Sequence, residues 1–207
     1  MRGDAMTETV VLRTERLLLR PFTPCDVEDV LGYTSDPEWA RYQVNIPPVP
    51  FSRKDAESLV AMFSDPSKWE EIGILQMFAL ALEGRVIGEI CLNQRVHDRQ
   101  NDRVEPAYSL SRQHWGKGLM TEAARAAMNW TFETYDINRM FAYCDPRNVG
   151  SWRVMEKLGM RREGLLRGHL KWNGEFRDQL YYGILRSEWE RGSERAVMSK
   201  PQGRAKA

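Results

Sequence analysis

A glycine-containing turn between a strand and a helix constrains this chain more than any other feature. Residues 113–121 include Gly116 and Gly118, separated by one residue. The pattern before the turn, 104–111, predicts a strand, and the pattern after it, 121–132, predicts a helix with small residues on its inner face. Glycines let a backbone approach a ligand closely, and the first amides of a helix lack intrahelical partners and point toward an anion. We interpret the segment as a phosphate-binding turn, which a pyrophosphate would fit.

Two common nucleotide-binding motifs do not match this turn. A nucleotide-hydrolysing loop needs Gly-x-x-x-x-Gly-Lys-Ser/Thr, but Lys117 is followed by Gly118 and has no glycine at the required distance upstream. A dinucleotide-binding turn needs a third glycine where this chain has Thr121. On the motif alone, a purely structural turn remains an alternative.

Composition limits the class of protein. The chain has 207 residues, 42% of them apolar, which is enough for one domain with a sizeable core. A net charge of +1 gives no reason to expect nucleic acid or an anionic membrane as the main partner. The polar residues 1–8 lack the apolar core of a signal peptide, so we expect a cytoplasmic protein. Cys25, Cys91 and Cys144 are too widely spaced to indicate a metal site and are interpreted as packing residues.

The remaining periodicity alternates between strands and helices and predicts one domain over residues 10–190. Residues 1–9 are expected to be flexible, and the basic segment 191–207 to be a disordered tail. Pro106 predicts a bulge or a locally unpaired edge in its strand, because it cannot donate a ladder hydrogen bond. The predicted strands are 14–22, 76–82, 85–92, 104–111, 139–144, 162–172 and 176–185. The predicted helices are 26–33, one opened by Ser52, 121–135 and one capped by Asn148.

Several motifs together resemble one family. Gln113-x-x-Gly-x-Gly follows a strand, and Asn148-x-x-Ser and Glu156-Lys-Leu-Gly-Met follow the next one. This combination resembles the GNAT superfamily of acetyl-coenzyme A-dependent N-acetyltransferases, over about residues 14–189. Thr14-Glu-Arg-Leu-Leu-Leu-Arg, Trp115-Gly-Lys-Gly and Asn148-x-x-Ser are most similar to the RimJ/RimL-type branch, which acetylates N-termini of ribosomal proteins.

The resemblance implies a fold and a cofactor site. The fold class is α/β (α+β), with a mixed, mostly antiparallel seven-stranded sheet flanked by about four helices. The fourth and fifth strands, ending near Ser111 and Cys144, would splay apart to hold the pantetheine arm of acetyl-coenzyme A. Backbone groups of 109–111 would pair with that arm, and amides of 113–121 would hold the pyrophosphate. The implied cofactor-binding residues are Ser109, Leu110, Ser111, Gln113, His114, Trp115, Gly116, Lys117, Gly118, Leu119, Met120, Thr121, Asn148 and Ser151.

The implied reaction is direct attack of a neutral amine on the thioester carbonyl. Deprotonating an α-amine at pH 7 costs about 1 kcal/mol, against about 4.6 kcal/mol for a lysine, so one carboxylate suffices for an α-amine. The resemblance implies that Glu105 is a base acting through water; the alternative is a solvated strand glutamate. It implies that Ser151 protonates the leaving thiolate; the alternative is a serine that only binds cofactor. Pro106 replaces the aliphatic residue usual after that glutamate.

Other positions in the motifs are less favourable for catalysis. Trp152 occupies the helix where many members have a catalytic tyrosine, so a tyrosine acid there is not expected. Leu170 occupies the place of a carboxylate found in the RimJ/RimL-type branch, and His169 would face the opposite side of a regular strand. Cys144 lacks an electropositive partner in the sequence and is not expected to be a nucleophile.

The leading hypothesis is an N-acetyltransferase acting on a primary amine, with a protein N-terminus favoured by the resemblance. A small-molecule acetyltransferase acting on polyamines, aminoglycosides or amino acids is an alternative. A non-catalytic acyl-coenzyme A-binding module is another. A polycationic acceptor would need Asp36, Glu38, Asp102 and Glu105 to converge, which the sequence leaves open. The protein is expected to be a monomer or a homodimer.

Overall fold

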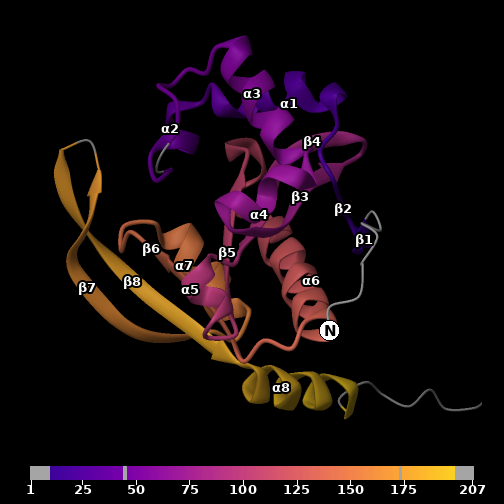
Figure 1. Ribbon diagram of the computed structural model, residues 1–207, viewed down its shortest axis with the longest axis vertical. Coiled ribbons are helices and arrows are strands. Elements are labelled where there is room, and N and C mark those ends of the chain that lie inside the picture. Colours follow the sequence, from indigo (N-terminus) through magenta and orange to yellow (C-terminus); the bar gives the residue numbers. More distant parts are fainter. Residues whose placement is uncertain (1–9, 44–45, 173, 199–207) are drawn as a thin grey trace, which may run out of the picture.

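One mixed sheet runs through the molecule (Figure 1). The computed structural model describes residues 10–43, 46–172 and 174–198. The strand order is β1-β2-β3-β4-β5-β6-β8-β7. The strands are β1 (Leu12–Arg13), β2 (Leu18–Arg20), β3 (Ile74–Leu82), β4 (Arg85–Asn93), β5 (Arg103–Leu110), β6 (Arg139–Cys144), β7 (Arg161–Trp172) and β8 (Glu175–Leu185). The described residues form eight strands instead of the seven expected, because β1 precedes the predicted first strand 14–22. A turn in which Thr14 N donates to Leu17 O at 3.0 Å separates β1 from β2.

The sheet opens between β5 and β6, as predicted. These strands are parallel and pair only at Arg103↔Arg139 and Val104↔Met140, while the other neighbouring strands are antiparallel. Beyond these two pairs the strands diverge, and we call this opening the splay. On its other edge β5 stays in register with β4 through Pro106. The proline therefore causes no bulge, and the unpaired edge predicted as the alternative faces the splay.

Helices cover both faces of the sheet. The helices are α1 (Val27–Thr34), α2 (Pro37–Ala40), α3 (Arg53–Phe63), α4 (Trp69–Ile72), α5 (Val96–Arg99), α6 (Leu119–Thr134), α7 (Val149–Lys157) and α8 (Arg186–Met198). The four predicted helices correspond to α1, α3, α6 and α7; the one-turn helices α2, α4 and α5 and the C-terminal helix α8 were not predicted. No helix within the described ranges is both long and apolar enough to cross a membrane.

Two apolar clusters lie on opposite faces of the sheet. One contains α6 and α7 residues such as Phe132 and Met155, with Val104 and Leu110 of β5; we call this the α6 face. The other contains α1 and α3 residues such as Val30, on the α1 face. Side chains alternate along a strand, so successive residues of β5 point to the two faces in turn. This alternation decides which site residues can meet.

Polar side chains fix the helix starts that the sequence indicated. Ser52 and Asp55 form a capping box at α3, with Asp55 N donating to Ser52 Oγ at 3.2 Å. Asn148 caps α7, its Oδ1 accepting from Ser151 N at 3.2 Å. Gly159, with a φ of 88°, ends the same helix in the left-handed conformation that glycine tolerates best. These local signals set where α3 begins and where α7 begins and ends.

Strands β7 and β8 form a long hairpin that extends beyond the helices (Figure 1). Their register shifts between Leu166 and Leu170, and nearly all of β7 is exposed. The following helix, α8, is anchored by Trp189, whose ring stacks on Phe132 with centroids 5.0 Å apart. This helix continues to Met198, so the domain boundary expected at 190 falls inside it. The N-terminal residues 1–9 and the end of the expected tail, 199–207, lie outside the described residues.

Candidate active site

The glycine turn joins β5 to α6 and presents free backbone amides at one end of the splay. Gly116 and Gly118 have φ angles of 72° and 77°, which a residue with a Cβ adopts only under strain. Glu122 N is the first amide that bonds back within α6, to Gly118 O at 3.0 Å. The amides of residues 119–121 therefore project from the helix end.

Two amides of the turn are already bonded. His114 N donates to Ser111 O at 2.9 Å, and Trp115 N donates to Arg112 O at 3.0 Å. The indole of Trp115 donates to Leu110 O at 2.7 Å, although the side chain is 45% exposed. The backbone available to an anion is therefore narrower than the predicted range, running from Gly116 to Thr121.

Hydrogen bonds from the N-terminal segment connect it to the glycine turn and to the first turn of α6. Glu122 accepts hydrogen bonds from Thr14 Oγ1 at 2.6 Å, Arg16 N at 2.8 Å and Arg16 Nε at 2.7 Å. Arg16 also donates through Nη1 to Lys117 O at 3.0 Å. Although partial burial opposes it, these hydrogen bonds lower the pKa of Glu122. Thr14 and Arg16 belong to the N-terminal motif of the sequence, so that motif supports the turn.

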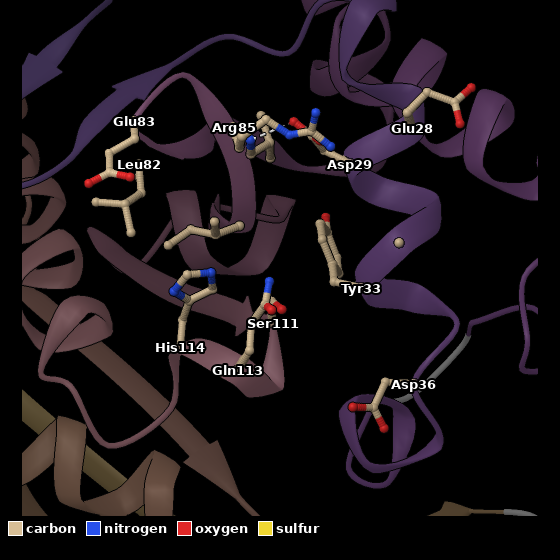
Figure 2. Close-up of a pocket in the computed structure, with 13 residues that line it drawn as sticks. Glu28, Asp29, Tyr33, Asp36, Leu82, Glu83, Arg85, Ser111, Gln113 and His114 are labelled. Carbon is tan, nitrogen blue, oxygen red and sulfur yellow. Dashed lines mark hydrogen bonds and ion pairs between the residues drawn. The ribbon is translucent and has the colours of Figure 1, made fainter.

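The side chains of Gln113 and His114 point away from the splay. They line a cavity of about 490 Å³ between the glycine turn and α1, together with Tyr33 (Figure 2). The same cavity is lined by the carboxylates Glu28, Asp29, Asp36 and Glu83. Burial and nearby Lys117 lower the pKa of His114, which favours its neutral form. The one arginine of the lining, Arg85, is already paired with Asp29, so a phosphate would meet mainly carboxylates here and these two side chains do not form an anion site.

A second hollow, of about 520 Å³, lies on the other side of the turn, along the outer surface of α6. Gly118 and Thr121 line it beside the basic residues Arg125 and Lys157. The Arg125 guanidinium donates to Lys157 O, which joins α6 to the end of α7. This hollow therefore combines free helix amides with two basic side chains, and of its two carboxylates, Glu15 and Glu122, the second is paired with Arg16. The inner residues Leu119 and Met120, by contrast, are buried in the core and contribute only backbone.

The α6 face of the splay is lined by hydroxyl and thiol groups. Tyr108 Oη donates to Ser151 O at 3.1 Å and lies 3.2 Å from Ser151 Oγ. The Cys144 thiol hydrogen-bonds with Ser151, and burial raises the pKa of Cys144 to about 11. Cys144 is therefore a neutral thiol at pH 7, which agrees with its interpretation as a packing residue. Ser151 thus lies beside β5, and its partner Tyr108 was not predicted.

Glu105 lies on the opposite, α1 face of β5. Its side chain is 9% exposed and pairs with Arg95 Nη1 at 3.1 Å. Burial raises the pKa of Glu105, although Arg95 and a hydrogen bond from Tyr143 lower it in part. Because residues 105 and 108 point to opposite faces, Glu105 and Ser151 face the splay from its two sides.

A second carboxylate near the splay was not predicted. Glu89 of β4 lies directly across from Ser109 and accepts hydrogen bonds from Ser109 Oγ and from Tyr33 Oη, the latter at 2.6 Å. Trp39 Nε1 donates to Ser109 Oγ at 3.0 Å and ties α2 to the same group. Burial raises the pKa of Glu89. Exposed Ala107 lies between Glu105 and Ser109, so carboxylates flank it on both sides. In the sequence, the Glu89 position was hidden within an otherwise apolar hairpin.

The hairpin bulge corrects one prediction about β7. His169 was expected to face away in a regular strand, but the register shift allows His169 Nε2 to hydrogen-bond with Tyr181 Oη at 3.0 Å. Tyr181 stacks on Tyr143, with ring centroids 5.0 Å apart and planes at 18°. Tyr143 in turn contacts Glu105. His169 therefore lies on the α1 face, at the end of an aromatic row that starts beside Glu105.

The acidic residues considered for a polycationic acceptor do not converge. Asp36 lies 3.9 Å from Arg112, just after β5, whereas Asp102 lies just before β5. A strand of this length spans about 27 Å. Glu38 pairs with Arg41 at 3.4 Å on α2. Glu105 is therefore the one of these four carboxylates that lies beside the splay.

Comparisons with known proteins identify relatives across most of the chain. Residues 16–161 match the family model described as "Acetyltransferase (GNAT) domain". The uncharacterized N-acetyltransferase p20 of Bacillus licheniformis is 32% identical over 179 residues, covering 86% of this chain and 97% of that protein. A solved GNAT-family acetyltransferase from Bacillus anthracis superimposes with a TM-score of 0.73 at 30% identity, covering 86% of this chain and 99% of that one. The ribosomal protein uS5-alanine N-acetyltransferase of Escherichia coli is 33% identical over 85 residues, 41% of this chain and 44% of that protein.

Proposed function

The chain belongs to the GNAT family and is an acetyl-coenzyme A-dependent N-acetyltransferase, and from that premise we propose that it acetylates the N-terminal α-amine of a protein. The observation that supports an acetyl-transfer site in the splay is the placement of three groups around it. Free amides lie at one end, Ser151 lies on one face and Glu105 on the other. A thioester held between β5 and β6 would meet an amine from the Glu105 side, while its sulfur would lie on the Ser151 side.

The cofactor would lie across the end of β5. Its pantetheine arm would pair with the unpaired edge of β5 up to Ser111, and its pyrophosphate would accept from the amides of residues 116–121. The adenosine end would follow the hollow on α6, where Arg125 and Lys157 supply positive charge. In this pose Asn148 holds the first turn of α7 in place through its cap, and Ser151 faces the thioester.

Glu105 and Ser151 would divide the proton transfers. Glu105, its pKa raised by burial, would take a proton from the amine through a water molecule, and Ser151 would give one to the departing sulfur. The proton lost by the amine balances the one gained by the thiolate. The N–C bond forms as the C–S bond breaks, and no further reactant is needed.

The ion pairs of Glu105 and of nearby Asp98 favour a single amine over a polycation. Glu105 pairs with Arg95, and Asp98 pairs with Arg103 at 2.7 Å, so these carboxylates are already neutralised. An α-amine needs only about 1 kcal/mol to lose its proton at pH 7, which one partly neutralised carboxylate can supply. The β7–β8 hairpin extends beyond the helices (Figure 1), and none of the β7 residues is buried, so an extended polypeptide would have exposed backbone to lie against. The partial similarity to the uS5-alanine N-acetyltransferase also supports a protein N-terminus as the acceptor.

An acceptor panel tests the proposal. Purified protein and acetyl-coenzyme A are mixed with short peptides, spermidine or an aminoglycoside, and released coenzyme A thiol is measured. Peptides with free N-termini should be acetylated, and the same peptides with blocked N-termini but free lysines should not. Faster turnover of spermidine or the aminoglycoside than of any peptide would contradict the acceptor. Calorimetric binding of acetyl-coenzyme A without thiol release for any amine would contradict catalysis.

A further inference from the structure

The hydroxyl of Tyr108 is a polar group on the α6 face of the splay that the proposed mechanism does not use. It reaches from β5 to the first turn of α7, 43 residues further along the chain, where it contacts both oxygen atoms of Ser151. Its neighbours on the same face, Val104 and Leu110, are core residues. Tyr108 is therefore the β5 side chain that connects the strand to the candidate acid.

Two side chains contact the Ser151 hydroxyl, Tyr108 and the Cys144 thiol, and the thiol is the weaker hydrogen-bonding partner. The backbone N–H of Ser151 donates to Asn148 Oδ1 at 3.2 Å, which fixes the main chain but not the side chain. A serine hydroxyl has one hydrogen to donate and two lone pairs to accept with. Tyr108 Oη lies 3.1 Å from Ser151 O and 3.2 Å from Ser151 Oγ, so one phenolic hydrogen can be shared between the two. The hydrogen of Ser151 then remains available to the weakly accepting Cys144 sulfur or, once a thioester is bound, to the thioester sulfur.

We propose that Tyr108 is a positioning residue that donates to Ser151 and directs the Ser151 proton toward the leaving sulfur. The inference rests on the proposed role of Ser151 and adds a residue to it. As the C–S bond breaks, sulfur takes the hydrogen of Ser151, while Oγ keeps the hydrogen bond from Tyr108 and regains a proton from water in the splay. Tyr108 keeps its own proton throughout.

The environment of Tyr108 argues for positioning and against proton donation by the phenol itself. Burial raises the pKa of Tyr108 well above that of a free phenol, because the phenolate would be poorly solvated between β5 and α7. Tyr108 can orient Ser151 through a hydrogen bond while its phenol stays protonated and uncharged. Removing the hydrogen bond between Tyr108 and Ser151 should therefore lower kcat, and only when Ser151 is present.

Tyr108→Phe tests the inference, with Tyr182→Phe as the matched control. Tyr182 packs in the same apolar cluster, and its hydroxyl donates to Glu156 Oε1 at 3.2 Å, outside the proposed chemistry. At saturating acetyl-coenzyme A and with an α-amine peptide, Tyr108→Phe should lower kcat about tenfold, with less than about a twofold change in the KM for acetyl-coenzyme A. Tyr182→Phe should stay within about twofold of the parent. Thermal melting of both variants separates a loss of fold from a loss of turnover.

A double-mutant cycle with Ser151→Ala makes the result decisive. If Tyr108 acts through Ser151, adding Tyr108→Phe to Ser151→Ala should change kcat by less than about twofold. An equal tenfold loss in both backgrounds, or equal effects of the two tyrosine variants, would overturn the inference. Normal turnover of Ser151→Ala would overturn both the inference and the acid role of Ser151. No acetylated product from the parent protein would instead refute the proposed function.

Discussion

Replacing Glu122 with glutamine tests whether the N-terminal segment holds the glycine turn. Glu122 accepts three hydrogen bonds from Thr14 and Arg16, at 2.6–2.8 Å, with its side chain 16% exposed. A hydrogen bond to a charged group contributes about 1.5–3 kcal/mol to the free energy of unfolding. The Arg16 side chain is 42% exposed, so solvent screening reduces the contribution of its ion pair with Glu122 to about 1 kcal/mol or less. Glutamine keeps one acceptor oxygen and presents an NH₂ group to the remaining donors. We therefore expect a loss of about 2 kcal/mol in the free energy of unfolding.

The assay is urea unfolding together with thermal melting, with Glu133→Gln as control. Glu133 is exposed on the same helix, so its replacement should change the free energy of unfolding by less than about 0.5 kcal/mol. A loss of 2 kcal/mol in a domain of this size corresponds to a melting temperature lower by about 4–8 °C. Because Arg16 also holds Lys117 O, the variant should bind acetyl-coenzyme A about threefold to tenfold more weakly by calorimetry.

The pH dependence gives an independent check. The folded-state pKa of Glu122 is lowered, so its contribution is complete above the unfolded pKa of about 4.3 and is lost as the pH falls through the folded value. The difference between the parent and Glu122→Gln should therefore be full at pH 7 and shrink below about pH 4. Equal stability and equal cofactor affinity for the Glu122 and Glu133 variants at pH 7 would refute the reasoning.

Three further predictions concern the splay and its borders. Glu105→Gln should lower kcat/KM for an α-amine peptide mainly below about pH 8, where the amine must give up a proton; a loss that is the same at pH 6 and pH 9 would remove Glu105 as the base. Gly118→Ala should weaken acetyl-coenzyme A binding measured by calorimetry about fivefold to thirtyfold, because a φ of 77° costs a residue with a Cβ about 1–2 kcal/mol; unchanged affinity would place the pyrophosphate elsewhere. Gly88→Ala should lower the free energy of unfolding by about 2 kcal/mol or more, since the added Cβ would lie 2.3 Å from Ser109 O; a urea midpoint equal to that of the parent would contradict this packing.

The sequence predicted the parts of the fold that depend on local patterns. The glycines at 116 and 118, the Ser52 and Asn148 caps and the turn at Gly84 each specify a backbone conformation within a few residues, and each is confirmed. The splay was implied by the resemblance, and the short β5–β6 pairing confirms it. The first strand was predicted to begin at Thr14, but residues 14–17 form a turn and β2 begins at Leu18.

Contacts between distant segments could not be predicted. Glu89 meets Tyr33, 56 residues away, and Glu122 meets Thr14, 108 residues away, so no local spacing signals either pair. The expectation that His169 faces away from its neighbour Leu170 held for a regular strand, and the bulge removes that regularity. Side-chain partners of this kind are decided by how the elements pack, which a single sequence does not specify.

The splay also divides the molecule mechanically. Strands β1–β5 form one ladder and β6–β8 another, and only two residue pairs join them. Each ladder carries its own share of the site, Glu105 on one and the Cys144 end of β6 on the other. A bound acetyl-coenzyme A that hydrogen-bonded along the β5 edge would lie between the two ladders, where β5 and β6 do not pair with each other. Amide hydrogen exchange along β5 should then slow more on acetyl-coenzyme A binding than exchange in β3, because the ligand would join two cooperative units into one.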